Sequence, residues 1–378
     1  MNTVLFVAST YSHIVHFHLP YLQAFRELGW QVHVGCGGAP ADIPEADAVF
    51  SLPFEKRMSS PENFRAQAEL RRRMRENRYA LVCTHTSLAS FFARRAAAGL
   101  TDRPPLVTVA HGYLFGEQTG RLKNRVLLAA EKWTAPQTDL LLTMNEWDYR
   151  AAVRNRLGRR VENIPGIGVD FSRFDRPSDG AALRLQLGLT PSDFLLIYAA
   201  EFSARKNQAL LIRALADLPE RVRLLLPGQG ALLEECRALA RELGLESRVF
   251  FPGQLTDMPR WYRACDAAVS ASRSEGLPFN VMEAMYCRLP VVASAVKGHT
   301  DLLRDGGTGL LYPCGDGPAF VRKVRELMDS PALAEQLRDA AFRAVQPYRL
   351  DAVLPVVMDA YLSVLPESLR RESAALPL

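Results

Sequence analysis

Two glutamates in the segment SEGLPFNVMEAM, residues 274–285, have a spacing that could bind a ligand. Glu275 precedes a Gly-Leu-Pro turn and Glu283 follows it, and Pro278 predicts the first turn of a helix. The backbone amides of residues 276–279 would then lie at a helix N-terminus, where partial positive charge favours a phosphate. Carboxylates accept hydrogen bonds from sugar hydroxyls. The pattern therefore predicts a site for a diphosphate with hydroxyls on both sides, as in a sugar nucleotide.

A second segment, AAEFSARKNQ at residues 199–208, supplies positive charge. Arg205 and Lys206 stand directly before a predicted helix, so their charges add to the helix dipole. Exposed glutamates and lysines are common when taken singly. At the ends of two strands of one sheet, however, carboxylates and cations together favour binding of a sugar nucleotide.

The pattern of apolar residues predicts an α/β fold. Short runs rich in β-branched residues alternate with amphipathic stretches of helical period, which is typical of parallel sheets with crossover helices. We therefore expect two doubly wound, Rossmann-like units in tandem, with ligands at the carboxyl ends of their strands. The predicted strands are 3–8, 31–35, 80–84, 105–110 and 139–144 in the first half, and 194–200, 221–227, 248–251, 267–271 and 290–294 in the second.

The segment NIPGIGVDFSRFDRPSDG, residues 163–180, is dense in turn residues and predicts the linker between the units. We place the boundary near Asp170, which gives an acceptor-side domain 1–170 and a nucleotide-sugar-binding domain 171–345. Residues 346–378 read as helical with no strand to cover, so we expect them to pack back on the first domain.

Composition and the termini indicate a soluble, cytoplasmic protein. Of the 378 residues, 48% are hydrophobic and 23% charged, and no apolar run approaches the length of a membrane span. The start of the sequence lacks the basic flank and cleavage site of a signal peptide. The six cysteines form no CxxC pair, so neither a disulfide framework nor a zinc site is predicted from them.

The formal net charge of +5 arises in the first half of the sequence. Residues 1–170 contain 21 Lys and Arg against 16 Asp and Glu, while the remainder contains 25 of each sign. The excess is concentrated in FRAQAELRRRMRENRY, residues 64–79. This segment could be a solvated helix face, or a surface that contacts anionic lipid headgroups or an anionic acceptor. A nucleic-acid partner is not expected, because aromatic residues are not interleaved with the arginines.

The chain resembles the retaining glycosyltransferases of family 4, which have the two-domain GT-B fold. The family signature of two glutamates separated by seven residues is matched by Glu275 and Glu283, and residues 224–285 and 290–312 follow the family pattern. The first half is similar to bacterial transferases that build capsular polysaccharide or exopolysaccharide. The segments that carry this similarity are SHIVHFHLPYLQAFRELGWQVHV, VAHGYLF, TDLLLTMNEWDYRAA and IPGIGVD.

The resemblance implies roles for individual residues. Glu275 would contact hydroxyls of the donor sugar, Glu283 the ribose hydroxyls, and Lys206 the leaving nucleoside diphosphate. Gly253, in the loop FPGQ, falls where family members seat the base, and His111 would face the reacting sugar. The implied catalytic residues are His111, Glu275 and Lys206, and the implied donor-binding residues are Arg205, Lys206, Gly253, Glu275, Gly276, Leu277, Pro278 and Glu283.

The implied reaction moves a hexose or N-acetylhexosamine from a UDP-sugar to a glycan acceptor with retention of configuration and without a covalent enzyme intermediate. The acceptor is expected to be lipid-linked, which would bring the enzyme to the inner face of the cytoplasmic membrane as a peripheral protein. Charge on the departing diphosphate would be stabilised by Lys206, Arg205 and the helix dipole. We therefore expect no metal and no cofactor.

Two positions depart from the family pattern. Many members carry an arginine five positions before the lysine, but Glu201 stands there and Arg205 is adjacent to Lys206 instead. Arg205 either replaces the missing arginine or is solvated. Arg288 replaces a glycine usual after the second glutamate, which indicates different packing behind the donor helix.

Histidines gather in the segment STYSHIVHFHLP after the first predicted strand. We interpret His13 and His16 as acceptor-side residues, together with Tyr113 of the AHGYLF segment, and assign His18 a structural role. A zinc site is the alternative reading of three nearby histidines, and it is disfavoured because no acidic residue or second ligand cluster supports it.

Three alternative functions compete with that of a transferase. A nicotinamide dehydrogenase is disfavoured because GQGALL, residues 228–233, lacks the third glycine of the dinucleotide fingerprint. A GT-B sugar-nucleotide epimerase would convert its substrate without an acceptor. A non-catalytic sugar-nucleotide-binding partner of a membrane assembly would bind UDP without turnover, and the intact glutamates and Lys206 argue against it.

Overall fold

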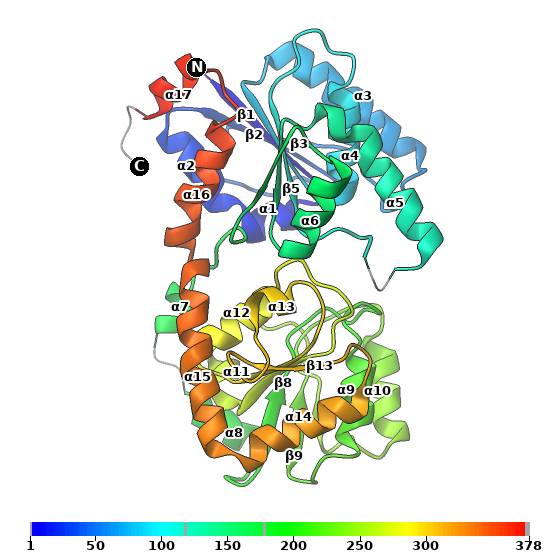
Figure 1. Cartoon of the computed structure of the whole chain (residues 1–378), viewed down its shortest axis with the longest axis vertical. Coiled ribbons are helices and arrows are strands. Elements are labelled where there is room, and N and C mark those ends of the chain that lie inside the picture. Colours follow the sequence, from blue (N-terminus) through cyan, green and yellow to red (C-terminus); the bar gives the residue numbers. More distant parts are fainter. Residues whose placement is uncertain (1, 117–118, 177–178, 375–378) are drawn as a thin grey trace. The chain divides into compact units, whose positions relative to one another are not determined.

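A computed structural model describes residues 2–116, 119–176 and 179–374. The chain divides into two compact units (Figure 1). Unit 1 consists of residues 1–168 and 351–378, and unit 2 of residues 169–350. The first boundary falls two residues before the predicted Asp170, and residues 346–350 belong to unit 2 instead of the C-terminal segment.

Unit 1 is built on a seven-stranded parallel sheet with strand order β3-β2-β1-β4-β5-β6-β7. Central strand β1 pairs with β2 and β4, so that Val4 lies opposite Val32 and Leu81. The edge strands β3 and β7 were not predicted, because they are four residues long and carry few buried apolar side chains. The strands are β1 Thr3–Ala8, β2 Gln31–Cys36, β3 Ala48–Ser51, β4 Leu81–His85, β5 Leu106–Ala110, β6 Leu140–Thr143 and β7 Arg160–Asn163.

The helices of unit 1 cover both faces of this sheet and include two from the C-terminal end of the chain (Figure 1). Tyr361 of the first C-terminal helix is fully buried, and its ring lies about 6 Å from those of Phe6, Tyr21 and Phe25. The C-terminal segment therefore completes the core of unit 1. The helices are α1 Tyr11–Phe17, α2 Leu19–Glu27, α3 Pro61–Asn77, α4 Ser87–Ala97, α5 Arg121–Thr134, α6 Glu146–Asn155, α16 Leu350–Leu362 and α17 Glu367–Ala374.

Unit 2 repeats the plan with a six-stranded parallel sheet of order β10-β9-β8-β11-β12-β13. The strands are β8 Phe194–Ile197, β9 Val222–Leu225, β10 Val249–Phe250, β11 Ala267–Ser270, β12 Val291–Ser294 and β13 Leu310–Tyr312. The helices are α7 Ser172–Asp175, α8 Gly180–Gln186, α9 Gln208–Leu215, α10 Leu233–Glu242, α11 Met258–Ala264, α12 Phe279–Tyr286, α13 His299–Leu302, α14 Gly317–Asp329 and α15 Pro331–Val345. The five predicted strands of this half are present, and β13 was not predicted.

Within the ranges that the structure describes, no helix is both long and apolar enough to cross a membrane.

Candidate functional site

The carboxyl edge of the unit 2 sheet holds an ion-paired group. Glu275 lies in the loop after β11, and Arg205 and Lys206 lie in the loop after β8, the neighbouring strand. Lys206 Nζ is 2.6 Å from Glu275 Oε1, and Arg205 Nη1 is 2.8 Å from Oε2. The hydroxyl of Ser272 donates a further hydrogen bond to Oε1. The predicted meeting of carboxylate and cations at these strand ends is thus present in the structure.

The neighbouring charges determine the protonation state of Glu275. Burial alone would raise the pKa of Glu275, but the adjacent Lys206 and Arg205 outweigh burial and lower that pKa to about 2. Burial lowers the pKa of Lys206, and the carboxylate of Glu275 opposes that change. The side chain of Arg205 is 46% exposed, whereas those of Lys206 and Glu275 are 12% and 7% exposed. Glu275 is therefore ionised at neutral pH, and Arg205 is the solvent-facing cation of the group.

Glu283 occupies a different environment on α12. Arg173 of α7 forms an ion pair with one of its oxygens, and the hydroxyl of Tyr262 of α11 donates to the other at 3.2 Å. Burial raises the pKa of Glu283 despite these partners. Arg173 was missed by the sequence analysis, since nothing in its own segment marks it and it lies 110 residues before its partner. The two signature glutamates thus have separate partners.

The backbone between the glutamates has the predicted turn followed by a helix. The sequence placed Pro278 in the first turn of the helix. In the structure Pro278 is the N-cap of α12 and has an extended backbone, so the helix begins one residue later, at Phe279. Leu277 is buried, and Gly276 is packed against Gly298 of the loop after β12. A Cβ atom at Gly298 would lie 2.8 Å from both Glu275 Cβ and the Gly276 carbonyl oxygen. Gly298, which the sequence did not indicate, therefore positions the Glu275 loop.

Gly253 follows β10 at the same edge of the sheet. Its carbonyl accepts a hydrogen bond from the amide of Gly228 at 2.8 Å. Gly228 has a φ of 142°, and a Cβ there would lie 2.1 Å from the carbonyl oxygen of Ala200. The glycines of GQGALL are thus needed for close packing of neighbouring strand-end loops, which gives them a role outside a dinucleotide fingerprint.

At the carboxyl edge of the unit 1 sheet, the structure gathers histidines. His13 of α1, His18 between α1 and α2, His85 at the end of β4 and His111 just after β5 have ring nitrogens within 4.8 Å of one another. His85 was missed, although its position as the last residue of a buried strand was a usable signal. These four residues are called the histidine cluster below.

Two predicted acceptor-side residues lie outside the histidine cluster. His16 is exposed, and its Nδ1 is 2.6 Å from the carbonyl oxygen of Ser12. Tyr113 is buried and stacks on Phe115 with ring centroids 4.5 Å apart. Its amide donates to Asp148 at 3.1 Å. Packing accounts for the position of Tyr113, whereas His16 faces solvent.

The basic segment 64–79 forms most of α3, and its arginines are largely engaged within unit 1. Arg72 and Arg73 form ion pairs with Glu69, and Arg72 also pairs with Glu76. The guanidinium of Arg71 donates to carbonyls of residues 95, 96 and 98 at the end of α4. The solvated-face interpretation therefore accounts for most of this charge.

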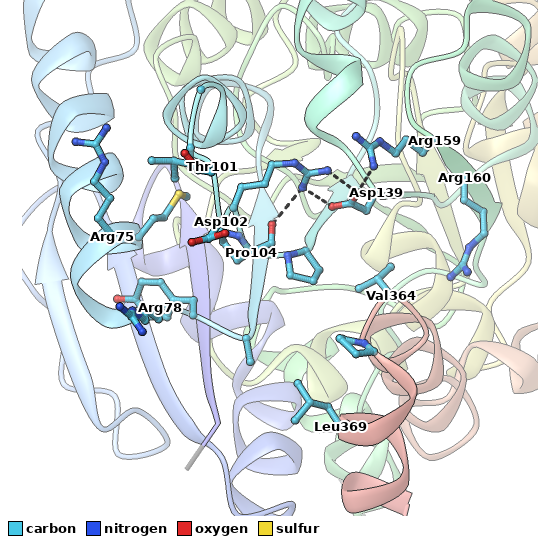
Figure 2. A pocket seen from close by; sticks show the side chains of 18 residues that line it. Arg75, Arg78, Thr101, Asp102, Pro104, Asp139, Arg159, Arg160, Val364 and Leu369 are labelled. Atoms are coloured by element: carbon cyan, nitrogen blue, oxygen red, sulfur yellow. Dashed lines mark hydrogen bonds and ion pairs between the residues drawn. The ribbon is translucent and has the colours of Figure 1, made fainter.

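A cavity of about 1190 Å³ lies at the amino ends of the unit 1 strands (Figure 2). Arg75 and Arg78 line it, and Asp139 on its wall accepts from Arg103 at 2.6 and 2.7 Å and pairs with Arg159 at 3.4 Å. Ligands of open parallel sheets bind at the carboxyl ends of strands, so this cavity lies at the wrong edge for the predicted chemistry.

Helix α5 exposes an apolar stripe. Leu122, Val126 and Trp133 are 76%, 62% and 61% exposed, and they lie on one face at helical spacing. Arg121 and Arg125 are exposed beside them. An exposed helix with apolar residues flanked by basic ones is typical of a membrane-surface helix.

Comparisons with known proteins find glycosyltransferases for both halves of the chain. Residues 181–344 match the family described as glycosyl transferases group 1, and residues 14–173 match glycosyltransferase family 4. The chain is 36% identical over 342 residues to EpsD of Bacillus subtilis (strain 168), which is named as a glycosyltransferase, covering 88% of this chain and 89% of the relative. It is 31% identical over 312 residues to D-inositol 3-phosphate glycosyltransferase of Streptomyces bingchenggensis (strain BCW-1), and the match covers 75% of this chain and 66% of that relative.

Solved structures show the same architecture. Alr3699/HepE of Anabaena, in complex with UDP and glucose, superposes with a TM-score of 0.79 at 23% identity, covering 96% of this chain and all of that one. Sucrose-phosphate synthase of Thermosynechococcus elongatus superposes with a TM-score of 0.80 at 20% identity, and the match covers 96% of this chain and 99% of that one. The predicted GT-B fold of two Rossmann-like units is confirmed.

Proposed function

Because the chain belongs to glycosyltransferase family 4, we propose that it transfers a hexose or N-acetylhexosamine from a UDP-sugar to a lipid-linked glycan acceptor in exopolysaccharide biosynthesis. The observation that carries the donor part is the buried Glu275 carboxylate held between Lys206 and Arg205 at the carboxyl edge of the unit 2 sheet. Two further findings support it. HepE, a structural neighbour, is described in complexes with UDP and with UDP-glucose, and EpsD is a relative over nearly the whole chain.

The proposed donor complex rearranges the ion-paired group. The diphosphate takes hydrogen bonds from Lys206 and Arg205, and it adjoins the N-terminus of α12, where backbone dipoles favour negative charge. Glu275, still ionised, then accepts hydrogen bonds from hydroxyls of the donor sugar. Glu283 accepts from the ribose hydroxyls in place of one of its present partners.

The proposed transfer step depends on electrostatic stabilisation. The acceptor hydroxyl attacks the donor carbon on the face from which UDP departs, the bond to the diphosphate oxygen breaks, and the hydroxyl proton passes to the departing phosphate. Lys206 and Arg205 stabilise the negative charge that grows on that phosphate. His111, at the carboxyl end of β5, donates or accepts a hydrogen bond at the reacting sugar as a neutral imidazole. On this proposal no metal takes part in the transfer.

The test separates donor binding from transfer. Thermal unfolding with UDP, GDP or NAD at equal concentration identifies the nucleotide, because a ligand that binds only the folded state raises the melting temperature. We expect a rise with UDP that is absent in Glu283→Ala. Release of UDP from UDP-sugars is then measured with and without a lipid-linked acceptor. Acceptor-dependent release supports the proposal, whereas acceptor-free conversion of the sugar identifies an epimerase, and stabilisation by NAD alone excludes the donor site.

For the acceptor side, we propose that α5 lies on anionic membrane lipids. The exposed stripe of Leu122, Val126 and Trp133 would enter the headgroup region, and the flanking Arg121 and Arg125 would contact anionic headgroups. This assignment moves the predicted membrane contact from α3 to α5, since most α3 arginines already have partners in unit 1.

Vesicle co-sedimentation tests the role of α5. The protein should bind vesicles rich in phosphatidylglycerol more strongly than phosphatidylcholine vesicles, and salt should weaken the binding. Val126→Asp should reduce it. Leu185→Asp is the matched control, because Leu185 is a 77% exposed side chain on a short helix of unit 2. Equal loss in both variants, or indifference to lipid charge, would contradict the assignment.

A further inference from the structure

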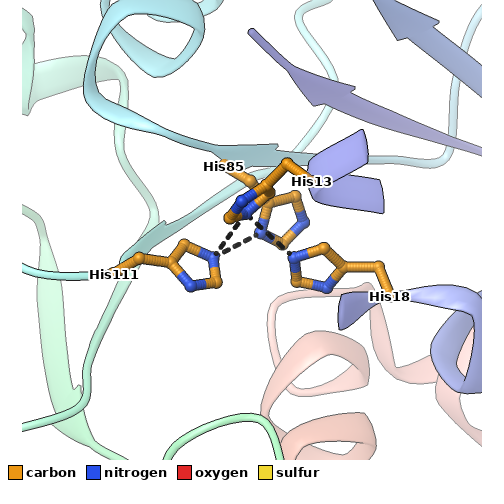
Figure 3. Close-up of side chains that lie close together, drawn as sticks. All are labelled: His13, His18, His85 and His111. Carbon is orange, nitrogen blue, oxygen red and sulfur yellow. Dashed lines mark hydrogen bonds between the residues drawn. The ribbon is translucent and has the colours of Figure 1, made fainter. Parts of the chain in front are cut away.

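The histidine cluster has a geometry that hydrogen bonds alone do not explain (Figure 3). Nε2 of His13 lies 3.3 Å from Nε2 of His18 and 3.3 Å from Nε2 of His111. Nε2 of His111 also lies 3.2 Å from Nδ1 of His85. One nitrogen of each ring therefore faces a common centre.

Proton counting limits what these contacts can be. A nitrogen of an imidazole ring carries either one proton or one lone pair in the ring plane, so it makes one in-plane hydrogen bond. The inner nitrogens of His13 and His111 each face two others. At most two of the three short contacts can be well-aligned hydrogen bonds, and the third has to share a proton or a lone pair that another contact already uses. A cation at the centre removes this conflict, because all four nitrogens then offer lone pairs.

We propose that the histidine cluster binds one Zn²⁺ ion. Zinc–nitrogen bonds of 2.0–2.1 Å in a tetrahedron place ligand nitrogens roughly 3.3 to 3.4 Å apart. The three short contacts of 3.2 to 3.3 Å match this edge length, and the remaining pairs within 4.8 Å require only small side-chain adjustment. Four imidazoles suit zinc among the biological metals, whereas Mg²⁺ and Ca²⁺ prefer oxygen ligands.

The surroundings favour neutral rings. His18 and His85 are fully buried and His13 and His111 are partly exposed, and burial lowers the pKa of every ring in the cluster, to about 4 for His13. Metal binding at neutral pH would thus displace few protons. The outer nitrogens of His18 and His85 are buried without a hydrogen-bond partner among the described residues. A missing outer partner typically costs 10- to 100-fold in affinity, so we expect binding weaker than that of a fully supported zinc site.

The proposed zinc has a structural role. Four protein ligands leave no open coordination position, so the ion would not act on substrate. It would join the α1–α2 junction to the ends of β4 and β5 and fix the ring of His111. The zinc reading that the sequence disfavoured considered three histidines of one segment, whereas the cluster takes two residues from that segment and two from strand ends. The proposal does not rest on the donor site, because all four ligands are in unit 1.

Metal analysis of the full-length protein, with any affinity tag removed, tests the proposal. After incubation with ZnSO₄ and desalting, we expect about one zinc ion per chain, measured by inductively coupled plasma mass spectrometry. The melting temperature should fall on treatment with a chelator and recover with Zn²⁺. Replacement by Co²⁺ should give the intense visible absorption of tetrahedral cobalt. Absence of bound zinc and of any chelator effect would overturn the proposal.

A pair of variants on one helix supplies the control. His13→Ala removes a partly exposed ligand and should lower zinc affinity at least about tenfold. His16→Ala removes an exposed histidine of the same helix that lies outside the histidine cluster and should leave affinity unchanged. Equal zinc binding by the two variants would place the metal elsewhere and overturn the proposal. Neither result depends on transferase activity, so UDP stabilisation can succeed or fail independently.

Discussion

The two sheets carry different side chains at the same topological position, charged ones in unit 2 and neutral ones in unit 1. At the carboxyl edge of the unit 2 sheet, a carboxylate is held by two cations, and its pKa falls to about 2. At the carboxyl edge of the unit 1 sheet, four imidazoles face one another, and burial keeps them neutral. The fold thus fixes where functional side chains gather, and the loop residues decide whether the site is ionic or neutral. Charged side chains suit a departing diphosphate, whereas neutral imidazoles suit hydrogen bonds to a sugar or, as proposed above, binding of a metal ion.

Removal of a cation from the ionic site should have the largest effect. We expect Lys206→Ala to lower kcat/KM by about 10²- to 10³-fold, because loss of one contact to developing charge costs about 3 to 4 kcal/mol. Acceptor-dependent UDP release measures this loss. Lys323→Ala, which removes an ion-paired lysine of α14 in the same unit, is the control and should retain activity.

Lys206→Ala also leaves the buried carboxylate of Glu275 with Arg205 as its remaining cation, so the fold of unit 2 should be destabilised as well. The double variant Lys206→Ala/Glu275→Gln removes that uncompensated charge. Its thermal stability should recover while its activity stays low. Recovery of both would show that Lys206 acts on stability instead of on the departing phosphate.

A change in the shape of the ionic site should be nearly as harmful as a change in its charge. In Gly298→Ala, the new methyl group meets Glu275 and the Gly276 carbonyl, and the residue keeps a φ of 82° that favours glycine. We expect kcat/KM to fall about 10²-fold, since a displacement of about 1 Å can cost that much. Gly306→Ala has a similar φ of 71° with open space around its Cβ, so it isolates backbone strain. Equal losses in the two variants would exclude the steric explanation.

The neutral site should respond more weakly. We expect His111→Gln to lower kcat about fivefold, because a hydrogen bond between neutral groups contributes about 1 kcal/mol. Acceptor-dependent UDP release gives kcat, and zinc content measured on the same sample separates a lost sugar contact from a lost ligand. A loss as large as that of Lys206→Ala would remove the contrast between the neutral and ionic sites.

The sequence predicted the strands that are buried and the charged residues that follow them. Runs such as those of β1 and β8 are readable because burial on both faces demands continuous apolar residues. The short edge strands β3 and β7 lack that signal. Glu275 and Lys206 each follow one of the buried strands that could be predicted. Their meeting at the edge of the sheet then required only the assumption that these two strands are neighbours.

The residues that were missed depend on tertiary placement. Arg173 reaches Glu283 from a four-residue helix in the predicted linker, and Gly298 acts only through its distance to the Glu275 loop. His85 joins histidines from two distant segments. No local pattern encodes such contacts, so a sequence can indicate which residues are available but not which of them meet.

The smallest expected effect distinguishes the two signature glutamates, because the pKa of Glu275 is lowered and that of Glu283 is raised. The depressed pKa of Glu275 gives stability that is present above its unfolded pKa near 4.5 and is lost as pH falls toward 2. The raised pKa of Glu283 gives stability that is present below 4.5 and is lost as pH rises through the folded pKa. Melting temperatures measured from pH 3 to 7 should therefore diverge. The deficit of Glu275→Gln relative to the unmodified protein should shrink as pH falls, and Glu283→Gln should gain relative stability as pH rises. If the melting temperatures of the two variants change with pH in parallel, the two pKa values are not shifted in opposite directions. Lys206 and Arg173 would then offset the effect of burial on their carboxyl partners to the same extent.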